Sequence, residues 1–204
     1  DGVVSNAKLA QDIISADTAL GAEPADTDEF LVSDAGTLKR VDYSYIKDSG
    51  GITEADAWRL TADLTEDGDP ISSNLERADD ATFEKIGTGM SESSGTFTFP
   101  STGLYLVTAQ ANHVRSAADD AIVTLLIKTT PDNSTYTIRA QCRQFLVGTS
   151  VEQNAFTQTY VNVTNTTNVK VRFSYTSSNS NTLAGDTDSI KTGFCFIRLG
   201  DSQW

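Results

Sequence analysis

The sequence predicts a mainly β protein, in which residues 51–204 form one antiparallel sandwich behind an N-terminal segment, residues 1–50. Three observations predict this. Short runs of strand-forming residues recur between turns, the chain is rich in Thr, Ser, Asn and Gly, and it carries only one short helical signal. Hydrophobic residues make up 38% of the 204, which is enough for a single sandwich core.

The helical signal is Val3–Ala19, at the start of the N-terminal segment. Ser5 can cap this helix, and Leu9 and Ile13 fall four residues apart on one face. A helix this short is marginal alone, because nucleation is costly and no packing offsets it. It therefore needs a partner, and copies of itself from neighbouring chains would provide one.

A β-hairpin is predicted next. The apolar run Glu29–Val32, the turn Ser33–Gly36 and the alternating run Thr37–Val41 fit two strands joined by a tight turn. Residues 49–51, Ser-Gly-Gly, are typical of a linker. Because residues 1–50 are too few to hold a core, we expect them to form a stalk that assembles with other chains.

Beyond the linker, Trp58–Leu64 is expected to be the first strand of the sandwich. Eight further strands are expected near residues 82–86, 94–99, 103–114, 120–129, 135–146, 154–163, 168–176 and 190–199. Turn residues separate nearly all of them. This number and spacing fit a sandwich or jelly roll.

Alternation predicts which face of a strand covers the core. Val169–Tyr175 is apolar at every second position, so one face of this strand is expected to be buried. The segment 136–143 also alternates. Its expected core face carries Tyr136, Ile138, Ala140 and Cys142.

The closing strand Phe194–Leu199 is apolar at nearly every position. Such a strand meets the core on one face and something else on the other, most simply another subunit. A central strand beneath a long loop is the alternative. The subunit interface is therefore predicted at Leu104, Leu106, Phe194 and Phe196.

Two motifs resemble those of the C1q-like globular head, within the wider tumour-necrosis-factor-like (TNF-like) jelly-roll superfamily. Phe97–Tyr105 matches the pattern F-x-x-P-x-x-G-x-Y, and Gly193–Ile197 matches the closing G-F strand. Residues 83–87 and 177–188 correspond to an early strand and to the last exposed loop. The resemblance covers residues 55–200 and implies a ten-strand jelly roll that assembles as a tight homotrimer.

The proline and glycine of the first motif have physical roles in the turn that it forms. Pro100 cannot donate to a ladder and so ends its strand. Gly103 allows a positive φ or a close backbone approach. The long strand that follows is expected to point alternate residues inward, namely Tyr105, Val107, Ala109 and Ala111.

The N-terminal segment resembles parts of bacteriophage fibres. Asp26–Ile46 resembles hairpin modules of tail and head fibre proteins, and Leu9–Ile14 resembles the helical linkers between such modules. The Gly-x-y stalk usual in animal relatives does not occur. The resemblance implies a virion structural protein on the particle surface, with a head for assembly and host-surface display and an N-terminal segment that binds other virion proteins. A lectin-like module that recognises a host glycan or receptor, or a capsule depolymerase, is the alternative.

Charge excludes some partners. The net charge is −13, with 7 Lys and Arg against 21 Asp and Glu in residues 1–92. Such a surface repels phosphates, so nucleic acid is not expected to bind. No run approaches the roughly 18 apolar residues of a membrane span, and membrane insertion is not expected either.

Little in the sequence points to catalysis. His113 is the only histidine, and no G-x-S-x-G motif accompanies it, so no enzyme is expected. The apical-loop candidates for a ligand or for Ca²⁺ are Asp119, Asp120, Asp186 and Asp188. Paired carboxylates serve glycosidases, but Ca²⁺ is the better alternative for oxygen-rich loops, and these lack a full EF-hand pattern. No other cofactor or metal is expected.

The two cysteines and a few aromatic residues are the remaining candidates for a functional role. Cys142 and Cys195 are expected to be free buried thiols, with a disulfide left open. The loop Thr176–Thr182 lacks the aromatic face that sugars stack on, so Tyr136 or Tyr175 would have to be exposed. Trp204 is expected to anchor against a neighbour.

Overall fold

The computed structural model describes residues 18–47, 51–79, 82, 84–115, 121–148, 150–179 and 181–203. The chain divides into two compact units, Asp1–Gly51 and Ile52–Trp204. The helix expected over residues 3–19 lies almost wholly outside the described ranges, as do Asp119, Asp120 and Trp204. Within these ranges no helix combines the length and apolarity needed to cross a membrane.

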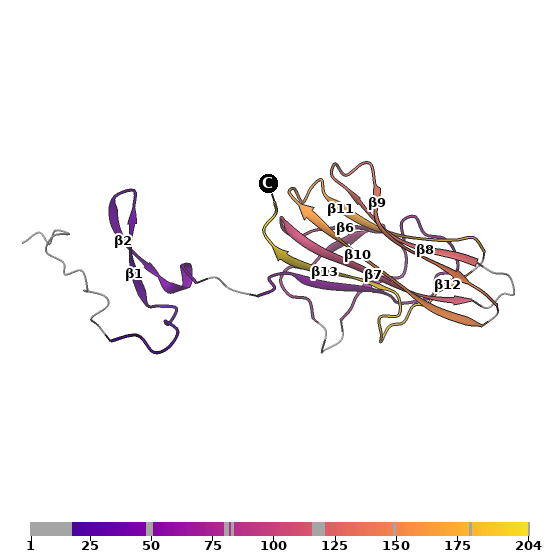
Figure 1. Ribbon diagram of the computed structural model, residues 1–204, viewed down its shortest axis with the longest axis horizontal. Helices are drawn as coiled ribbons and strands as arrows, with labels where there is room; N and C mark the ends of the chain where they lie inside the picture. Colours follow the sequence, from indigo (N-terminus) through magenta and orange to yellow (C-terminus); the bar gives the residue numbers. More distant parts are fainter. Residues whose placement is uncertain are drawn as a thin grey trace, which may run out of the picture. The chain divides into compact units, whose positions relative to one another are not determined.

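The first unit contains the predicted hairpin, which is confirmed. Strands β1 (Glu29–Asp34) and β2 (Thr37–Asp42) pair antiparallel (Figure 1). The turn residues Ala35 and Gly36 have φ of 49° and 85°, the left-handed pair that a two-residue hairpin turn requires. A short 3₁₀ helix, η2 (Tyr43–Tyr45), follows β2.

The second unit, which we call the head, is a sandwich of two antiparallel sheets (Figure 1). The first sheet has the order β10-β7-β13-β3-β4 with β12 beside β7, and the second has the order β5-β6-β11-β8-β9. Their bounds are β3 Ala55–Leu60, β4 Leu75–Arg77, β5 Ser91–Ser93, β6 Thr96–Thr98, β7 Gly103–Arg115, β8 Ala121–Thr130, β9 Thr137–Leu146, β10 Val151–Val163, β11 Lys170–Ser177, β12 Thr182–Leu183 and β13 Gly193–Gly200.

Most predicted strands are confirmed within a few residues, from β7 to β11 and at β13. The strand predicted at 82–86 is wrong, because in the described part of that segment Ile86 makes only an isolated bridge to Ala55. The prediction missed β4, β5 and β12. These strands have two or three residues each, which is too short for alternation to be visible.

The core lies between the two sheets and is built on aromatic rings. Phe173 of β11 and Phe194 of β13 stack face to face across the sandwich, with ring centroids 3.7 Å apart. Phe97 packs against both of them and against Phe196. The alternation predicted for Val169–Tyr175 is confirmed, because its apolar residues are all buried in this core.

The face predicted for residues 136–143 is only half right. Ala140 and Cys142 pack against the core, but Ile138 is 52% exposed. The ladder between β8 and β9 shifts register at Ile127 and Lys128, whose partners are Ala140 and Ile138. A bulge of one residue reverses which side chains point inward, and Ile138 therefore lies on the outer face with Lys128.

The turn between β6 and β7 explains the spacing of its motif residues. Gly103 has a φ of +155°, and a Cβ there would lie 2.5 Å from Nε of Arg198 and 2.8 Å from the carbonyl oxygen of Gly200. Only glycine therefore lets β7 start this close to β13. Tyr105 follows with its ring buried, and its hydroxyl donates to the Ser101 carbonyl oxygen.

Candidate assembly interface

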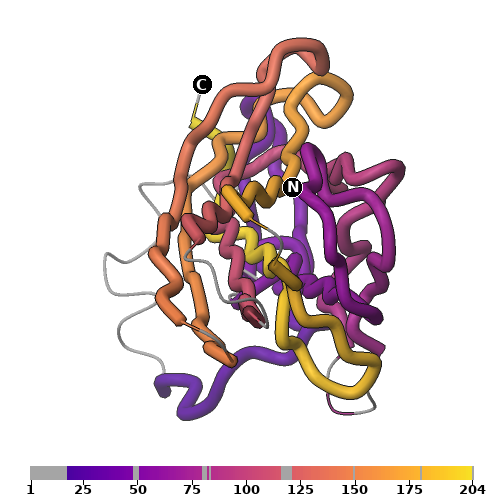
Figure 2. The backbone as a smooth tube through the Cα atoms, turned by 90° about the vertical axis from the view of Figure 1, so that its right-hand side faces the viewer, coloured from indigo at the N-terminus to yellow at the C-terminus, as the bar shows by residue number. Residues whose placement is uncertain are grey.

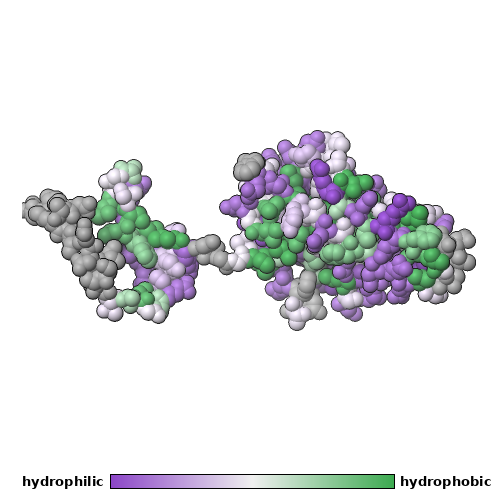
Figure 3. Space-filling view, in the orientation of Figure 1, coloured by the Kyte–Doolittle hydropathy of each residue, from purple (hydrophilic) through white to green (hydrophobic). Residues whose placement is uncertain are grey.

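The outer face of the first sheet carries an apolar surface that the described chain leaves uncovered. Leu106 of β7 lies between two cross-strand partners, Tyr160 of β10 and Ile197 of β13. Tyr160 is 65% exposed, Leu106 and Ile197 are half-buried, and Phe156 further along β10 is 56% exposed. In Figure 3 apolar side chains gather over the face in which β10, β7 and β13 lie in Figure 1. We call Leu104, Leu106, Phe156, Tyr160, Ile197 and Leu199 the apolar face.

The pleat of β13 corrects the predicted interface. Phe194 and Phe196 point inward and are 0% and 1% exposed in a single chain, so they are core residues that cannot meet another subunit. The residues between and after them, Cys195 and Ile197, point outward instead. The closing strand is apolar on both faces because one face lines the core and the other lies on the apolar face.

A second apolar surface runs along β9, the edge strand of the other sheet. Ile138, Phe145 and Val147 are each more than half exposed along this edge. The chain passes directly from β9 to β10, and these two strands are edge strands of the two sheets on the same margin of the sandwich (Figure 2). We call Ile138, Phe145 and Val147 the apolar edge. An exposed, apolar strand edge is a template for association.

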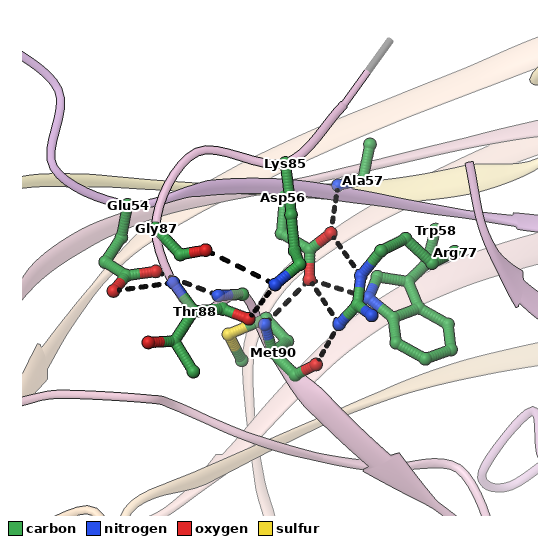
Figure 4. Close-up of polar contacts among 10 residues, drawn as sticks. Glu54, Asp56, Ala57, Trp58, Arg77, Lys85, Gly87, Thr88 and Met90 are labelled. Atoms are coloured by element: carbon green, nitrogen blue, oxygen red, sulfur yellow. Dashed lines mark hydrogen bonds and ion pairs between the residues drawn. The ribbon is translucent and has the colours of Figure 1, made fainter. Parts of the chain in front are cut away.

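A buried carboxylate organises the opposite side of the first sheet (Figure 4). Asp56, on the inner side of β3, accepts hydrogen bonds from Nε and Nη2 of Arg77 at 2.9 and 3.1 Å. It also accepts the indole N–H of Trp58 at 3.0 Å and the backbone N–H groups of Ala57 and Met90 at 3.0 and 2.7 Å. Five donors on one buried carboxylate satisfy its lone pairs, as a buried charge requires.

The same network holds the segment 85–90 against β3. Glu54 accepts the backbone N–H groups of Thr88 and Gly89, and Arg77 donates to the Met90 carbonyl oxygen while its guanidinium lies 4.9 Å from the centre of the Trp58 ring. Both carboxylates, Asp56 and Glu54, are engaged by protein donors, so this cluster is structural. This cluster was not predicted from the sequence, although Asp56 alternates with Trp58 and Leu60 and so indicates a charge on a core-facing side.

His113 lies inside the sandwich, where a substrate could not reach it. Its side chain is fully buried and its ring stacks on Tyr175 with centroids 5.4 Å apart, and among the described residues neither ring nitrogen has a hydrogen-bond partner. Burial lowers the pKa of His113 to about 4, because the charged imidazolium would be desolvated. Arg115, two residues along the same inward face, is also fully buried and donates to Asn181.

Burial of His113 predicts that the free energy of unfolding depends on pH. In the unfolded chain this residue titrates near 6.5, so between pH 6.5 and 4 the unfolded state binds more protons and folding weakens as pH falls. Going from pH 7.5 to 4.5 should cost about 2–3 kcal/mol of unfolding free energy, measured by urea denaturation. His113→Phe keeps a ring against Tyr175 and should lose most of this dependence. An unchanged slope in that variant would contradict the prediction.

Of the predicted loop carboxylates, Asp186 and Asp188 are described, and Asp186 is held by protein partners. Asp186 pairs with Lys191 at 2.9 Å and accepts the backbone N–H groups of Asp188 and Ser189. Lys191 and these N–H groups lower the pKa of Asp186 to about 2. Among the described residues no group of three or more His, Cys, Asp or Glu side chains could hold a metal ion. The Ca²⁺ alternative stays a prediction.

The aromatic residues considered for sugar stacking are covered. Tyr175 is 1% exposed, and the guanidinium of Arg172 lies 3.8 Å from the centre of the Tyr136 ring. The two cysteines, Cys142 and Cys195, are both free. Burial raises the pKa of the Cys195 thiol, which lies outward on β13.

Comparisons with known proteins identify the fold of the head. No protein-family model matches the sequence, and no curated protein does. Solved structures do match. The Eiger TNF of S. frugiperda is similar with a TM-score of 0.57 and 12% identity, over 76% of this chain and 97% of that one. Murine APRIL is similar with a TM-score of 0.52 and 9% identity, over 72% of this chain and 98% of that one.

The head is therefore a TNF-like jelly-roll sandwich. This confirms the fold class that the two motifs implied. At sequence identities near 10%, the similarity shows a shared fold and does not show a shared function.

Proposed function

We propose that this protein is a homotrimeric structural module, in which three heads close around a shared axis through the apolar face. The observation that carries the proposal is the apolar row Tyr160–Leu106–Ile197, which crosses three neighbouring strands and is exposed at Tyr160 and half-buried at the other two. A soluble monomer rarely leaves a continuous apolar surface of this kind uncovered. Burying it against a second copy would remove its side chains from water.

Two different apolar surfaces are compatible with three copies. A two-fold dimer that packs the apolar face of each head on the same face of the other leaves the apolar edge in water. If the apolar edge of one head instead packs on the apolar face of the next around a three-fold axis, both are covered in every copy and the contact closes as a ring of three. Obligate interfaces of this kind bury roughly 2,000 Å² or more.

Ile197→Asp tests the proposal. The side chain lies on the outer face, so a carboxylate there should leave the sandwich folded and turn the trimer into a monomer, because a charge would be buried in the apolar interface. Analytical ultracentrifugation should show a threefold drop in mass, with an unchanged circular dichroism spectrum. Ser93→Asp is the matched control, since it puts the same charge on an exposed strand position of β5, at the edge of the other sheet away from β9. A wild-type chain that sediments as a monomer would contradict the proposal.

We further propose that the trimer is a virion fibre or appendage, with the head displayed towards the host surface. The support is the hairpin unit, whose sequence resembles bacteriophage fibre modules and whose fold is confirmed. Immunogold labelling of purified particles with antibodies to residues 52–204 should place the protein on the particle surface. Absence of label on particles that contain the chain by mass spectrometry would contradict this. Binding to host glycans and the absence of enzymatic activity stay predictions.

A further inference from the structure

The hairpin unit has an apolar surface on each of its two faces. Leu31 and Leu38 lie on one face, diagonally across the ladder, and are 73% and 69% exposed. Phe30 and Val32 lie on the other face and are 41% and 38% exposed, and the Phe30 ring lies 6.0 Å from that of Tyr43. Figure 3 shows apolar side chains over this ribbon. No described residue of 18–47 is buried.

A hairpin built this way is not stable by itself. Two strands without a third strand or a covering layer are marginal in water, because most of their apolar surface stays exposed. The cross-strand ion pairs Lys39–Asp34 and Arg40–Glu29 are exposed, and pairs of this kind contribute 1 kcal/mol or less. Cover for both faces must therefore come from outside the hairpin.

We propose that the hairpins of three chains pack on one another as a second, separate assembly element, with the Leu31 face of each against the Phe30 face of the next. A two-fold pair of hairpins would cover only one face of each. A head-to-tail ring covers both, and it has the same three-fold symmetry as the proposed head trimer. The occupant of each face is thus a second copy of this chain.

The connection to the head makes this contact favourable. The inference rests on the proposed trimer, because three heads held together bring three hairpins into one small volume. Four residues, 48–51, lie between the hairpin region 18–47 and the first residue of the head, Ile52, and four residues reach at most about 14 Å when fully extended. Tethers this short give effective concentrations in the millimolar range, which suffices for contacts too weak to form between free chains.

Cysteine cross-linking of the full chain tests the packing. In a Cys142→Ser, Cys195→Ser background, Leu31→Cys and Val32→Cys together place one thiol on each face. Oxidation should then link three chains covalently, because face meets opposite face, and denaturing gels should show a trimer band. Each single variant is the matched control and should stay monomeric on the gel. Efficient dimers from Leu31→Cys alone would show like faces meeting and would overturn the proposal.

Hydrogen exchange gives a second, independent measurement. In the wild-type trimer, amides of residues 29–42 should exchange at least about tenfold more slowly than in Leu31→Ser, Leu38→Ser chains, because the ribbon opens when its cover is lost. Lys39→Gln removes an ion pair but no apolar cover, and its exchange should match wild type. In Ile197→Asp monomers the protection should also vanish. Protection that persists in those monomers would place the cover within the same chain and overturn the inference.

The two proposals fail differently. A wild-type chain of monomer mass would overturn the proposed function itself. A chain of trimer mass whose residues 29–42 exchange freely would leave the head trimer in place and overturn only the hairpin contact.

Discussion

Replacing Asp56 by Ala should destabilise the head by about 3–5 kcal/mol, because it removes a buried carboxylate and leaves its donors without an acceptor. The variant strands the Arg77 guanidinium and removes the acceptor of the Trp58 indole N–H and the Met90 backbone N–H. The segment 85–90 loses its main attachment to β3 as well. Urea denaturation at one fixed protein concentration measures the change, since assembly would otherwise contribute to the apparent stability.

Asp201→Ala is the matched control for that experiment. Asp201 also pairs with an arginine, Arg198, at 2.7 Å, but its side chain is 95% exposed. Solvent-exposed pairs contribute 1 kcal/mol or less, so the unfolding midpoint should barely move. Equal effects of the two substitutions would show that the Asp56 network is not the buried structural centre described above.

Phe196→Asp should abolish folding of the head. The ring is 1% exposed and packs against Phe97, Phe99 and Phe173. Loss of a buried Phe costs about 3–5 kcal/mol, and an unpaired carboxylate in the same place adds its desolvation, so the sum approaches the whole stability of an ordinary domain. The expected result is insoluble protein or the absence of a cooperative thermal transition.

The neighbouring substitution Ile197→Asp is the sharpest comparison, because it introduces the same charge one residue further along β13. It should stay folded and lose only the oligomer, since successive side chains of a strand point to opposite faces. Two folded monomers, or two unfolded chains, would contradict the assignment of the faces of β13.

Much of the sandwich could be predicted from local patterns. The long strands β7, β10 and β11 are alternating runs bounded by turn residues, and the motif around Pro100 and Gly103 marks a strand end and a close backbone approach. The exceptions have physical reasons. The strands β4, β5 and β12 are too short to show a period, and Ile138 faces outward because a bulge shifts the ladder.

The subunit interface stays a prediction, but the structure changes two of its four predicted residues. Leu104 and Leu106 do lie on the apolar face, whereas Phe194 and Phe196 line the core. A strand that is apolar at every position contains no information about which side chains point inward. Phe156 and Tyr160 were missed for a related reason, since their place on the same face depends on the pairing of β10 with β7, more than forty residues apart.

The sequence by itself determined the class of fold, the hairpin ahead of it and the position of the closing strand, because alternation and turn chemistry act between residues close in the chain. Only the tertiary structure decided the direction of each side chain of β13, the buried partners of Asp56 and the isolation of His113. These depend on pairings between strands distant in sequence, and a shift of one residue in any such register would exchange the core face and the outer face.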